Sequence, residues 1–327
     1  MNAMLDSLVI PMRVRGVRLE AEGIRSFELV STNGSPLPSW APGAHIEVQL
    51  PGGIARQYSL FNSPDETHCY RIAVKREPAS RGGSACLHEK IALGDTLLVR
   101  APRNLFGIDH NARRHVLIAG GIGITPILSM FQSLAARGED VTLHYFARSR
   151  AMAAFADLLA AHPAGAAINC HFGLDEMATR VRLQSILTEC APSAGGALYV
   201  CGPGALMELV ANRAAAAGWP DEAVHSESFG SALKPAATGG TFEVVFQRSG
   251  ARCTVQAGQT ILAAARAAGV EIVTSCEQGV CGACLTNVIE GMPEHNDAYL
   301  SKAERDGGKL ILPCVSRCQG HHMVLDL

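Results

Sequence analysis

The chain has 327 residues, of which 48% are hydrophobic and 18% charged, and its formal net charge is −2. A chain of this length is expected to form two or three domains of about 100–150 residues each. The balanced charge, without a long run of one sign, argues against nucleic-acid binding. No apolar stretch is long enough to cross a membrane, and the N-terminal residues lack a signal-peptide pattern. We therefore expect a cytoplasmic protein whose eleven cysteines serve as thiols or metal ligands rather than as disulfides.

Short alternating strands with Gly and Pro turns predict a small antiparallel barrel over residues 1–110. Between the strand-like residues 44–50 and 71–77 lies the segment "RQYSL". Its Arg56 can pair with a phosphate, Tyr58 can lie against a flat ring system, and Ser59 can form a hydrogen bond to that ring. Taken alone, the segment is equally compatible with a barrel strand whose arginine faces solvent.

A second candidate phosphate site follows in "SRGGSACLHEKI", residues 80–91. Arg81, Gly82, Gly83 and Ser84 precede a short helical pattern, and backbone N–H groups at such a junction can bind an anion.

The middle of the chain predicts a nucleotide-binding domain. An apolar strand in "HVLIAGGIGITP", residues 115–126, runs into Gly121 and Gly123, then into Thr125 and a helix over residues 127–138. This strand–turn–helix junction lets a pyrophosphate approach the backbone, although it is not the G-x-G-x-x-G fingerprint.

Two further strands support this prediction, over residues 140–149 and in "ALYVCGP", where Cys201 and Gly202 precede a helix over 204–218. Strands that alternate with helices predict a parallel sheet with its ligand at the carboxyl ends of the strands. An ordinary α/β core also contains tight turns, so the prediction depends on both glycine turns together.

A linker is expected at residues 230–240, which are rich in Gly, Ala and Pro. Its composition fits a mobile tether and a plain connector equally well. After it, residues 241–270 read as strand, turn, strand and helix, with Thr260 as N-cap and Gly269 at the helix end. Residues 321–327 are predicted to form a closing strand.

Four cysteines in this last part predict a [2Fe–2S] cluster. Cys276, Cys281 and Cys284 have the spacing C-x4-C-x2-C, and Cys314 follows a later apolar run. Such a cluster needs four thiolates, and this spacing is that of plant-type ferredoxins. Zinc is the alternative metal for these cysteines, but zinc sites favour paired C-x2-C units, and the second pair is missing. The other cysteines of the last and earlier parts are expected to be core or surface residues: Cys69, Cys86, Cys170, Cys190, Cys253 and Cys318.

The two predicted redox partners differ in how many electrons they exchange. A nicotinamide nucleotide gives up two electrons together, whereas an iron–sulfur cluster accepts one. A flavin can accept a pair and release single electrons, so we expect a flavin site within residues 1–110.

With these motifs in this order, the chain resembles the phthalate dioxygenase reductase family, including vanillate demethylase reductase subunits, over residues 10–327. The motifs that carry the resemblance are "RQYSL", "RGGS", "GGIGITP", "CGP", "ESFG" and the four cysteines. The resemblance implies a multidomain fold. An N-terminal antiparallel β-barrel of the ferredoxin reductase type would bind FMN over residues 1–110, and an α/β parallel-sheet domain would bind NAD over 111–229. A linker at 230–240 and an α+β β-grasp ferredoxin domain at 241–327 would complete it.

The resemblance also implies roles for individual residues. Ser59, Cys201 and Phe229 are expected at the reacting atoms, with Phe229 covering the flavin face; Glu227 beside it has an open role. The residues expected to contact the flavin are Arg56, Tyr58, Ser59 and Lys75. Those expected to bind its single phosphate are Arg81, Gly82, Gly83 and Ser84. Those expected to contact the nicotinamide nucleotide are Gly121, Gly123, Thr125, Cys201 and Gly202.

One segment departs from the family pattern. Where some relatives carry an acidic residue after the second strand, this chain has Arg148, Ser149 and Arg150. These side chains suit a 2′-phosphate, so NADPH stays open although the family favours NADH.

The function implied is that of a monomeric reductase, which passes electrons from NADH through FMN and the [2Fe–2S] cluster to a Rieske-type oxygenase or demethylase of aromatic compounds. Two alternatives remain at this point: a reductase that uses FAD and NADPH with another acceptor, and a zinc-containing binding protein.

Overall fold

The computed structural model describes residues 8–78, 82–190, 195–229, 240–274, 276–297 and 299–327. The chain divides into two compact units, Met1–Glu227 and Ser228–Leu327, and each is described by itself. Among the described helices, none has both the length and the apolar character needed to cross a lipid bilayer.

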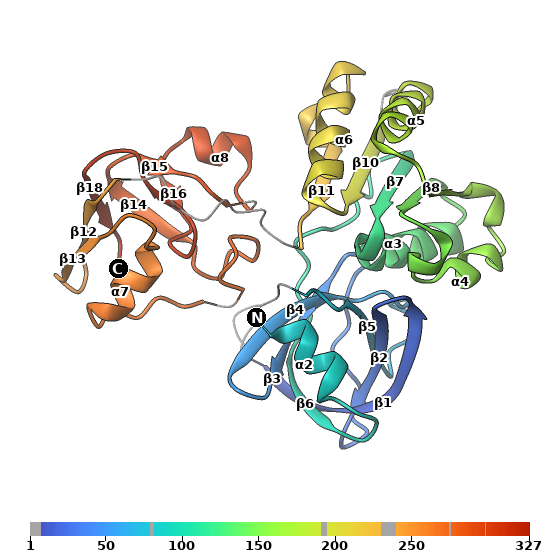
Figure 1. Ribbon diagram of the computed structural model, residues 1–327, viewed down its shortest axis with the longest axis horizontal. Helices are drawn as coiled ribbons and strands as arrows, with labels where there is room; N and C mark the ends of the chain where they lie inside the picture. Colours follow the sequence, from blue (N-terminus) through green and yellow to red (C-terminus); the bar gives the residue numbers. More distant parts are fainter. Residues whose placement is uncertain (1–7, 79–81, 191–194, 230–239, 275, 298) are drawn as a thin grey trace. The chain divides into compact units, whose positions relative to one another are not determined.

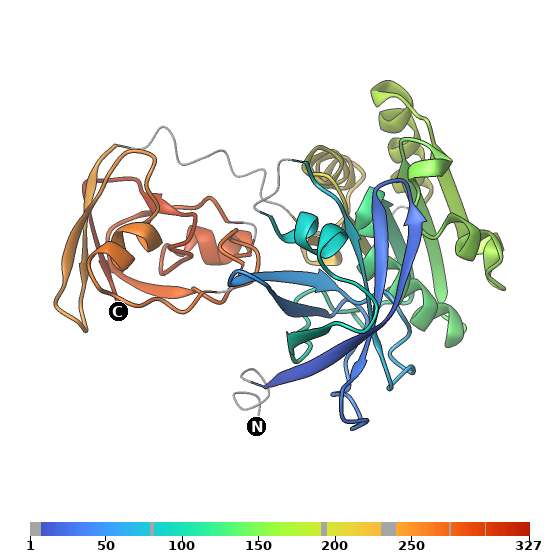
Figure 2. The ribbon, with the colours of Figure 1, turned by 60° about the horizontal axis from the view of Figure 1, so that its bottom comes forward.

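The first unit begins with a six-stranded antiparallel sheet in the order β4-β3-β6-β1-β2-β5 (Figure 1). Its strands are β1 (Val9–Ala21), β2 (Ile24–Ser31), β3 (His45–Leu50), β4 (Ile54–Ser59), β5 (Tyr70–Lys75) and β6 (Thr96–Arg100). A bridge between Leu60 and Ile72 joins the two edges, so the sheet closes into the predicted barrel. Helix α2 (Gly83–Glu89) packs against β3, β4 and β5, as Figure 2 shows.

Period-two alternation explains why these segments form barrel strands. In β1, Met12 and Val14 are buried in the barrel core, while Arg13 and Arg15 between and after them are exposed. Successive side chains of a strand point to opposite faces, so one face fills the core and the other meets water.

A five-stranded parallel sheet completes the first unit, in the order β11-β10-β7-β8-β9. The elements are β7 (Arg114–Gly120), η1 (Gly121–Gly123), α3 (Ile124–Ala136), β8 (Asp140–Ala147), η2 (Arg150–Met152), α4 (Ala156–Ala160), η3 (Gly165–Ala167), β9 (Ile168–Phe172), α5 (Glu176–Glu189), β10 (Gly196–Cys201), α6 (Gly204–Ala216), η4 (Asp221–Ala223) and β11 (Val224–Glu227). The chain runs outward from β7 to β9 and then returns to β10 on the other side of β7. Ligands of such sheets bind at the carboxyl ends of the strands at this switch point.

The barrel and the parallel sheet share a hydrophobic core. Ile24, Phe61 and Phe106 from the barrel part belong to the same buried cluster as residues of α3 and the sheet. The rings of Phe61 and Phe155 lie with centroids 4.5 Å apart. This shared core fixes the end of β4 relative to the carboxyl ends of the parallel strands.

The second unit is built on a mixed sheet in the order β13-β12-β18-β14-β16, with a separate pair β15-β17. Its elements are β12 (Phe242–Phe246), β13 (Arg252–Val255), α7 (Ile261–Ala267), β14 (Thr286–Glu290), β15 (Pro293–Glu294), α8 (Lys302–Asp306), β16 (Leu310–Ile311), β17 (Arg317–Cys318) and β18 (His322–Leu325). Strands β12 and β18 pair in parallel, while the neighbouring pairs are antiparallel. With α7 packed into the same core, this is the predicted β-grasp ferredoxin arrangement.

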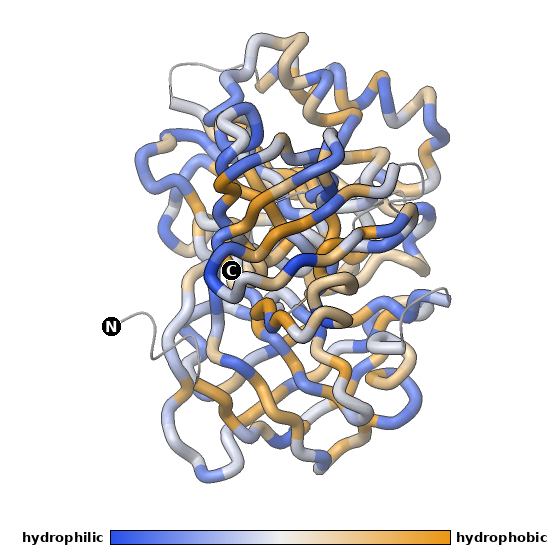
Figure 3. The backbone as a smooth tube through the Cα atoms, turned by 90° about the vertical axis from the view of Figure 1, so that its left-hand side faces the viewer, coloured by the Kyte–Doolittle hydropathy of each residue, from blue (hydrophilic) through white to orange (hydrophobic). Residues whose placement is uncertain are grey.

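Hydropathy and local signals account for this unit. Figure 3 shows hydrophobic and hydrophilic stretches alternating along the chain. The predicted N-cap is present, because Thr260 Oγ1 accepts a hydrogen bond from the Ala263 amide at 3.1 Å. Gly269, with φ +75°, follows the end of α7 as predicted.

Some elements were not anticipated. Strand β9 and helix α5 lack a clear periodic pattern of apolar residues. In α5, for example, Leu183 and Ile186 are buried, whereas the equally apolar Met177 and Val181 are exposed. Of the predicted linker, residues 230–239 lie outside the part of the chain that the structure describes.

Candidate functional site

Strand β4 presents the three residues predicted to contact a flavin. Arg56 and Tyr58 are half-buried and Ser59 is buried at the end of the strand. The Arg56 Nη1 donates a hydrogen bond to the Ala55 carbonyl at 2.7 Å. Burial raises the pKa of Tyr58, so its hydroxyl remains protonated at all ordinary pH values.

The second phosphate motif lies beside this strand. A Cβ atom on Gly83 would lie 2.7 Å from the Arg56 Cγ, so only glycine lets this arginine pack against the start of α2. Gly82 adopts φ +88° as the N-cap of α2 and provides no side-chain cap. The two segments predicted separately as phosphate ligands thus come together, while Arg81 lies outside the described residues.

Two further predicted flavin ligands are engaged with a neighbouring acidic residue. The Lys75 ammonium lies 2.5 Å from Glu77 Oε1, and the Ser84 hydroxyl accepts a hydrogen bond from the Glu77 amide at 3.1 Å. Lys75 and Ser84 therefore both contact Glu77, which lies two residues beyond the end of β5.

The two glycine turns of the parallel sheet meet backbone to backbone. A Cβ atom on Gly123 would lie 2.3 Å from the Cys201 carbonyl oxygen and 2.7 Å from the Gly202 nitrogen, which no side chain can tolerate. A Cβ on Gly121, where φ is +53°, would meet no atom within 4 Å. Thr125 is buried and its hydroxyl donates to the Ile122 carbonyl at 3.1 Å. Gly121 therefore faces open space at the switch point, whereas Gly123 and Thr125 shape the turn.

A hydrogen bond joins the barrel to the end of β11. The Ser59 hydroxyl donates to Glu227 Oε2 at 3.1 Å, although the two residues are 168 positions apart. Glu227 is the register partner of Cys201 on the adjacent strand. Burial raises the pKa of Glu227 to about 8, and the Ser59 hydrogen bond only partly opposes this shift. At neutral pH the Glu227 carboxyl therefore holds a proton most of the time.

The Cys201 thiol stands next to this carboxyl group. The side chain is fully buried, and burial followed by the nearby Glu227 charge raises its pKa well above the usual range. Cys201 thus remains a neutral thiol, which suits contact with an uncharged ring rather than attack as a nucleophile.

Phe229, predicted to cover a flavin, is 39% exposed and lies two residues beyond the end of β11. A large exposed aromatic side chain two positions from Glu227 in sequence is of the kind that can cover a planar ligand.

The segment predicted to discriminate between nucleotides follows β8. Arg148 is exposed, Ser149 accepts a hydrogen bond from the Met152 amide at 3.3 Å, and Arg150 pairs with Asp157 at 2.6 Å. Since Arg150 and Asp157 are 61% and 94% exposed, water screens this pair strongly.

The four predicted cluster cysteines are all buried and are associated in two pairs. A hydrogen bond between the thiols of Cys276 and Cys281, followed by burial, raises the pKa of Cys276. The thiol of Cys314 likewise bonds to the sulfur of Cys284, which raises the pKa of Cys314 and lowers that of Cys284. Four buried thiols in two pairs are the donor set that a [2Fe–2S] cluster would require, so these residues would fit this group.

Backbone amides point at two of these sulfurs. The amide of Gln278 lies 3.2 Å from Cys276 Sγ, and that of Ala283 lies 3.4 Å from Cys281 Sγ. Such donors stabilise the negative charge of bound sulfur and favour a cluster.

The remaining cysteines behave as predicted for core and surface residues. Cys170 on β9 is exposed and Cys253 is partly buried. The buried ones are Cys69, Cys86, Cys190 and Cys318.

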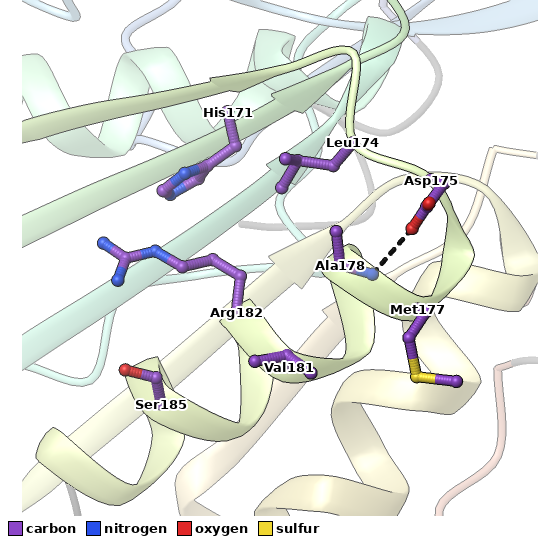
Figure 4. A pocket seen from close by; sticks show the side chains of 8 residues that line it. All are labelled: His171, Leu174, Asp175, Met177, Ala178, Val181, Arg182 and Ser185. Atoms are coloured by element: carbon purple, nitrogen blue, oxygen red, sulfur yellow. Dashed lines mark hydrogen bonds between the residues drawn. The ribbon is translucent and has the colours of Figure 1, made fainter.

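A groove of about 540 Å³ lies elsewhere, between the edge strand β9 and helix α5. Figure 4 shows His171 and Arg182 projecting into it, with the Asp175 carboxylate capping α5 at the Ala178 amide. None of the predicted cofactor ligands lines this groove, so we do not assign the chemistry to it.

A cluster of metal-ligating side chains also occurs on the barrel, formed by Glu66, His68 and Cys69. The Glu66 carboxylate is already paired with Arg71 at 2.9 Å. A guanidinium at this distance opposes binding of a cation, so this cluster is not assigned as a metal site.

Comparison with known proteins identifies the family. Residues 244–319 match the family model of the 2Fe-2S iron-sulfur cluster binding domain, and residues 96–224 match that of the dimethylamine monooxygenase subunit DmmA-like N-terminal domain. The chain is 42% identical to a vanillate O-demethylase oxidoreductase of Pseudomonas sp. (strain HR199 / DSM 7063), over 98% of this chain and 100% of that protein. The chain belongs to this family of oxygenase reductases.

Solved structures agree with this membership. Phthalate dioxygenase reductase, described as a modular structure for electron transfer from pyridine nucleotides to [2Fe-2S], is 36% identical with a TM-score of 0.76, and the match covers 98% of each chain. An intact type IV self-sufficient cytochrome P450 monooxygenase is 38% identical with a TM-score of 0.82 over 98% of this chain, which spans 41% of that longer protein.

The family membership confirms the main prediction from the sequence. The chain is an electron-transfer oxidoreductase, the reductase component of an oxygenase or demethylase system, with a C-terminal 2Fe–2S domain. The match to a cluster-binding domain removes the zinc-protein alternative. Family members of the phthalate dioxygenase reductase type bind FMN and NADH.

Proposed function

We propose that this reductase oxidises NADH at the seam between the barrel and the parallel sheet and delivers electrons from the four-cysteine loop to a Rieske-type oxygenase. The observation that carries the proposal is the hydrogen bond from Ser59 to Glu227. It brings the predicted flavin strand to the switch point of the nucleotide-binding sheet, where the two glycine turns meet.

The residues present fit a flavin mononucleotide. Arg56 packs against Gly83 at the start of α2, so one guanidinium and one glycine turn lie together, as a site for a single phosphate would require. We assign the phosphate to Arg56, Gly82, Gly83 and Ser84, and the ring to Tyr58 and Ser59. Arg81 and Lys75 are retained in the assignment from the family resemblance.

The nucleotide contacts follow from the same geometry. Gly121 leaves open space beside the switch point, and Gly123 with Gly202 keeps the neighbouring backbone close, so a pyrophosphate can approach. We assign Thr125 to shaping this turn and Cys201 to contact with the nicotinamide. Phe229 would cover the ring face until the nicotinamide displaces it.

The protein contributes orientation and control of one proton. The chemistry supplied by FMN, when bound, is acceptance of an electron pair and release of single electrons. The hydrogen bond to Glu227 orients the Ser59 hydroxyl. Glu227 holds a proton at its carboxyl group because burial raises its pKa to about 8. That proton can be passed through the Ser59 hydroxyl to an acceptor in the site. The neutral Cys201 thiol excludes water from the same place.

The cluster ligands are Cys276, Cys281, Cys284 and Cys314 in this proposal. The supporting observation is their arrangement as two thiol pairs with backbone amides directed at the sulfurs.

The proposed domain limits are those expected from the sequence: FMN domain 1–110, NAD domain 111–229, linker 230–240 and ferredoxin domain 241–327. The Rieske type of the acceptor, the monomeric state and the cytoplasmic location remain predictions from the sequence.

The test separates the two halves of the electron path. The Cys281→Ser variant should oxidise NADH with ferricyanide at the wild-type rate but lose reduction of cytochrome c through the cluster. Cys170→Ser, which changes an exposed cysteine on β9, is the matched control and should retain both activities. A Cys281→Ser protein that reduces cytochrome c at the wild-type rate would refute the ligand assignment.

The nucleotide and the flavin need their own measurements. Chromatography of the heat-released flavin distinguishes FMN from FAD. We expect a higher kcat/KM for NADH than for NADPH, as the family resemblance implies; the rival expectation is that Arg148, Ser149 and Arg150 bind a 2′-phosphate and favour NADPH. A higher kcat/KM for NADPH would reverse this assignment.

A further inference from the structure

A short segment after β15 packs against the loop that carries three of the cluster cysteines. A Cβ atom on Gly279 would lie 3.0 Å from the Asp297 Cα, and one on Gly282 would lie 2.3 Å from Cζ of the Tyr299 ring. Both glycines adopt φ +70°, which L side chains rarely adopt. The loop backbone is therefore held in direct contact with Asp297 and Tyr299.

The carboxylate of Asp297 is the buried centre of this contact, with its side chain 0% exposed. Its Oδ2 accepts hydrogen bonds from the amides of Tyr299 at 3.2 Å and Leu300 at 2.9 Å. Its Oδ1 accepts one from the Ser316 hydroxyl at 3.3 Å. These bonds fix the position of one negative charge inside the ferredoxin unit.

The same segment also holds the stretch that carries the fourth cysteine. The Asn296 amide donates to Ser316 Oγ at 3.2 Å, and the Asn296 Nδ2 donates to the Val315 carbonyl at 3.4 Å. Val315 and Ser316 directly follow Cys314 in the chain. Asn296 and Asp297 thus join the two separate cysteine-bearing stretches.

Two basic side chains face the buried carboxylate. Arg305 Nη2 donates to the Asp297 carbonyl at 2.8 Å and lies 3.8 Å from its Oδ2. His295, with its side chain 11% exposed, places Nδ1 3.4 Å from Oδ1. Arg305 is 38% exposed, so it joins the buried charge to the surface.

We propose that Asp297 and Arg305 form a pair that sets the reduction potential of the [2Fe–2S] cluster. Reduction of a bound cluster, by an electron that the nicotinamide would supply through the flavin, would add one negative charge to the iron–sulfur group as a whole. A fixed carboxylate on a residue that packs against Gly279, in the loop that carries three of the cysteines, would disfavour that added charge. The Arg305 guanidinium favours it. Asp297 and Arg305 are positioning residues that act through the loop and through their charge.

The experiment uses the full-length protein with its cofactors, and it rests on the proposed four-cysteine site. Asp297→Asn keeps the shape and an oxygen acceptor but removes the negative charge, so the potential should rise. Arg305→Gln leaves the carboxylate less compensated, so the potential should fall. We expect about a tenfold change in the reduction equilibrium for each, which is 59 mV for a one-electron couple. Arg305→Lys should restore the wild-type potential.

Potentiometric titration followed by visible absorption gives the midpoint, and iron content with the EPR signal of the reduced cluster gives the loaded fraction. The control is Asp326→Asn, which breaks the ion pair with Arg248 on the same unit. Because that arginine is 71% exposed, the equilibrium constant for reduction of the cluster should change by less than twofold.

The outcomes separate the two hypotheses. A wild-type protein without iron or a cluster spectrum would refute the proposed function itself. A loaded wild-type cluster with opposite shifts in the two charge variants supports the pair as a determinant of potential. Shifts in the same direction, no shift, or loss of the cluster from both variants would overturn it and leave the pair a purely structural role.

Discussion

Glu227 offers a direct test of how the seam between barrel and sheet is built. Its carboxyl group is held at the end of β11 by the Ser59 hydroxyl, and burial raises its pKa to about 8 from an ordinary value of 4.5. A carboxyl group whose pKa is higher in the folded than in the unfolded chain stabilises the fold when protonated. That stability is full below pH 4.5 and is lost as the pH rises through 8.

The magnitude follows from the shift. Each pKa unit corresponds to about 1.4 kcal/mol, so this one group lowers the free energy of unfolding by about 2.5 kcal/mol between pH 6 and pH 8.5. Glu227→Gln keeps a group of the same shape that accepts the Ser59 hydrogen bond and does not titrate. The variant should therefore be more stable than the wild type at high pH, and the difference should grow with pH.

Urea unfolding followed by tryptophan fluorescence is the appropriate assay, because Trp40 and Trp219 are the two tryptophans and both belong to the first unit. The difference in unfolding free energy between Glu227→Gln and wild type should increase by about 2.5 kcal/mol from pH 6 to pH 8.5. Glu222→Gln, an exposed carboxylate five positions earlier, is the control and should show no such trend. A difference that does not change with pH would refute the buried, protonated carboxyl group.

Three other expectations follow from single contacts. Gly123→Ala should destabilise the first unit by at least about 2 kcal/mol, because its Cβ would lie 2.3 Å from the Cys201 carbonyl oxygen, whereas Gly165→Ala meets open space and should be neutral; urea midpoints compare the two. His45 is buried and its pKa is lowered to about 4, so its contribution of about 3 kcal/mol is present above pH 6.5 and lost as the pH falls to 4. A His45→Phe protein should lose less stability over that interval, and equal losses would contradict the assignment. Arg317→Met should lower the melting temperature of the second unit by several degrees, measured by calorimetry, because the fully buried guanidinium donates to the Gly240 carbonyl at 2.8 Å and stacks on Phe242; an unchanged melting temperature would show that these contacts contribute little.

The local motifs were predictable because each is encoded in adjacent residues. The glycine turn at 120–123, the Thr260 cap and the C-x4-C-x2-C loop each depend on spacing within about ten positions. The barrel strands could be recognised because apolar and polar residues alternate along them with a period of two. The order of the motifs identified the family.

The contacts between distant segments could not be predicted in the same way. The Ser59–Glu227 bond spans 168 positions, and the sequence left the role of Glu227 open. The packing of Arg56 on Gly83 and of Asp297 on Gly279 also depends on tertiary approach rather than on a local pattern. The glycines were informative about loop shape but gave no sign of which residue would occupy the space beside them.

The cysteine thiols differ in solvent exposure, which permits selective chemical labelling. Of the eleven cysteines, all of which are described, Cys170 alone is exposed, and the four proposed cluster ligands are buried. A maleimide dye or nitroxide should therefore attach selectively to strand β9 in the native protein. Paired with the paramagnetic reduced iron centre, such a probe would report in solution whether the distance between β9 and the ferredoxin unit changes during turnover.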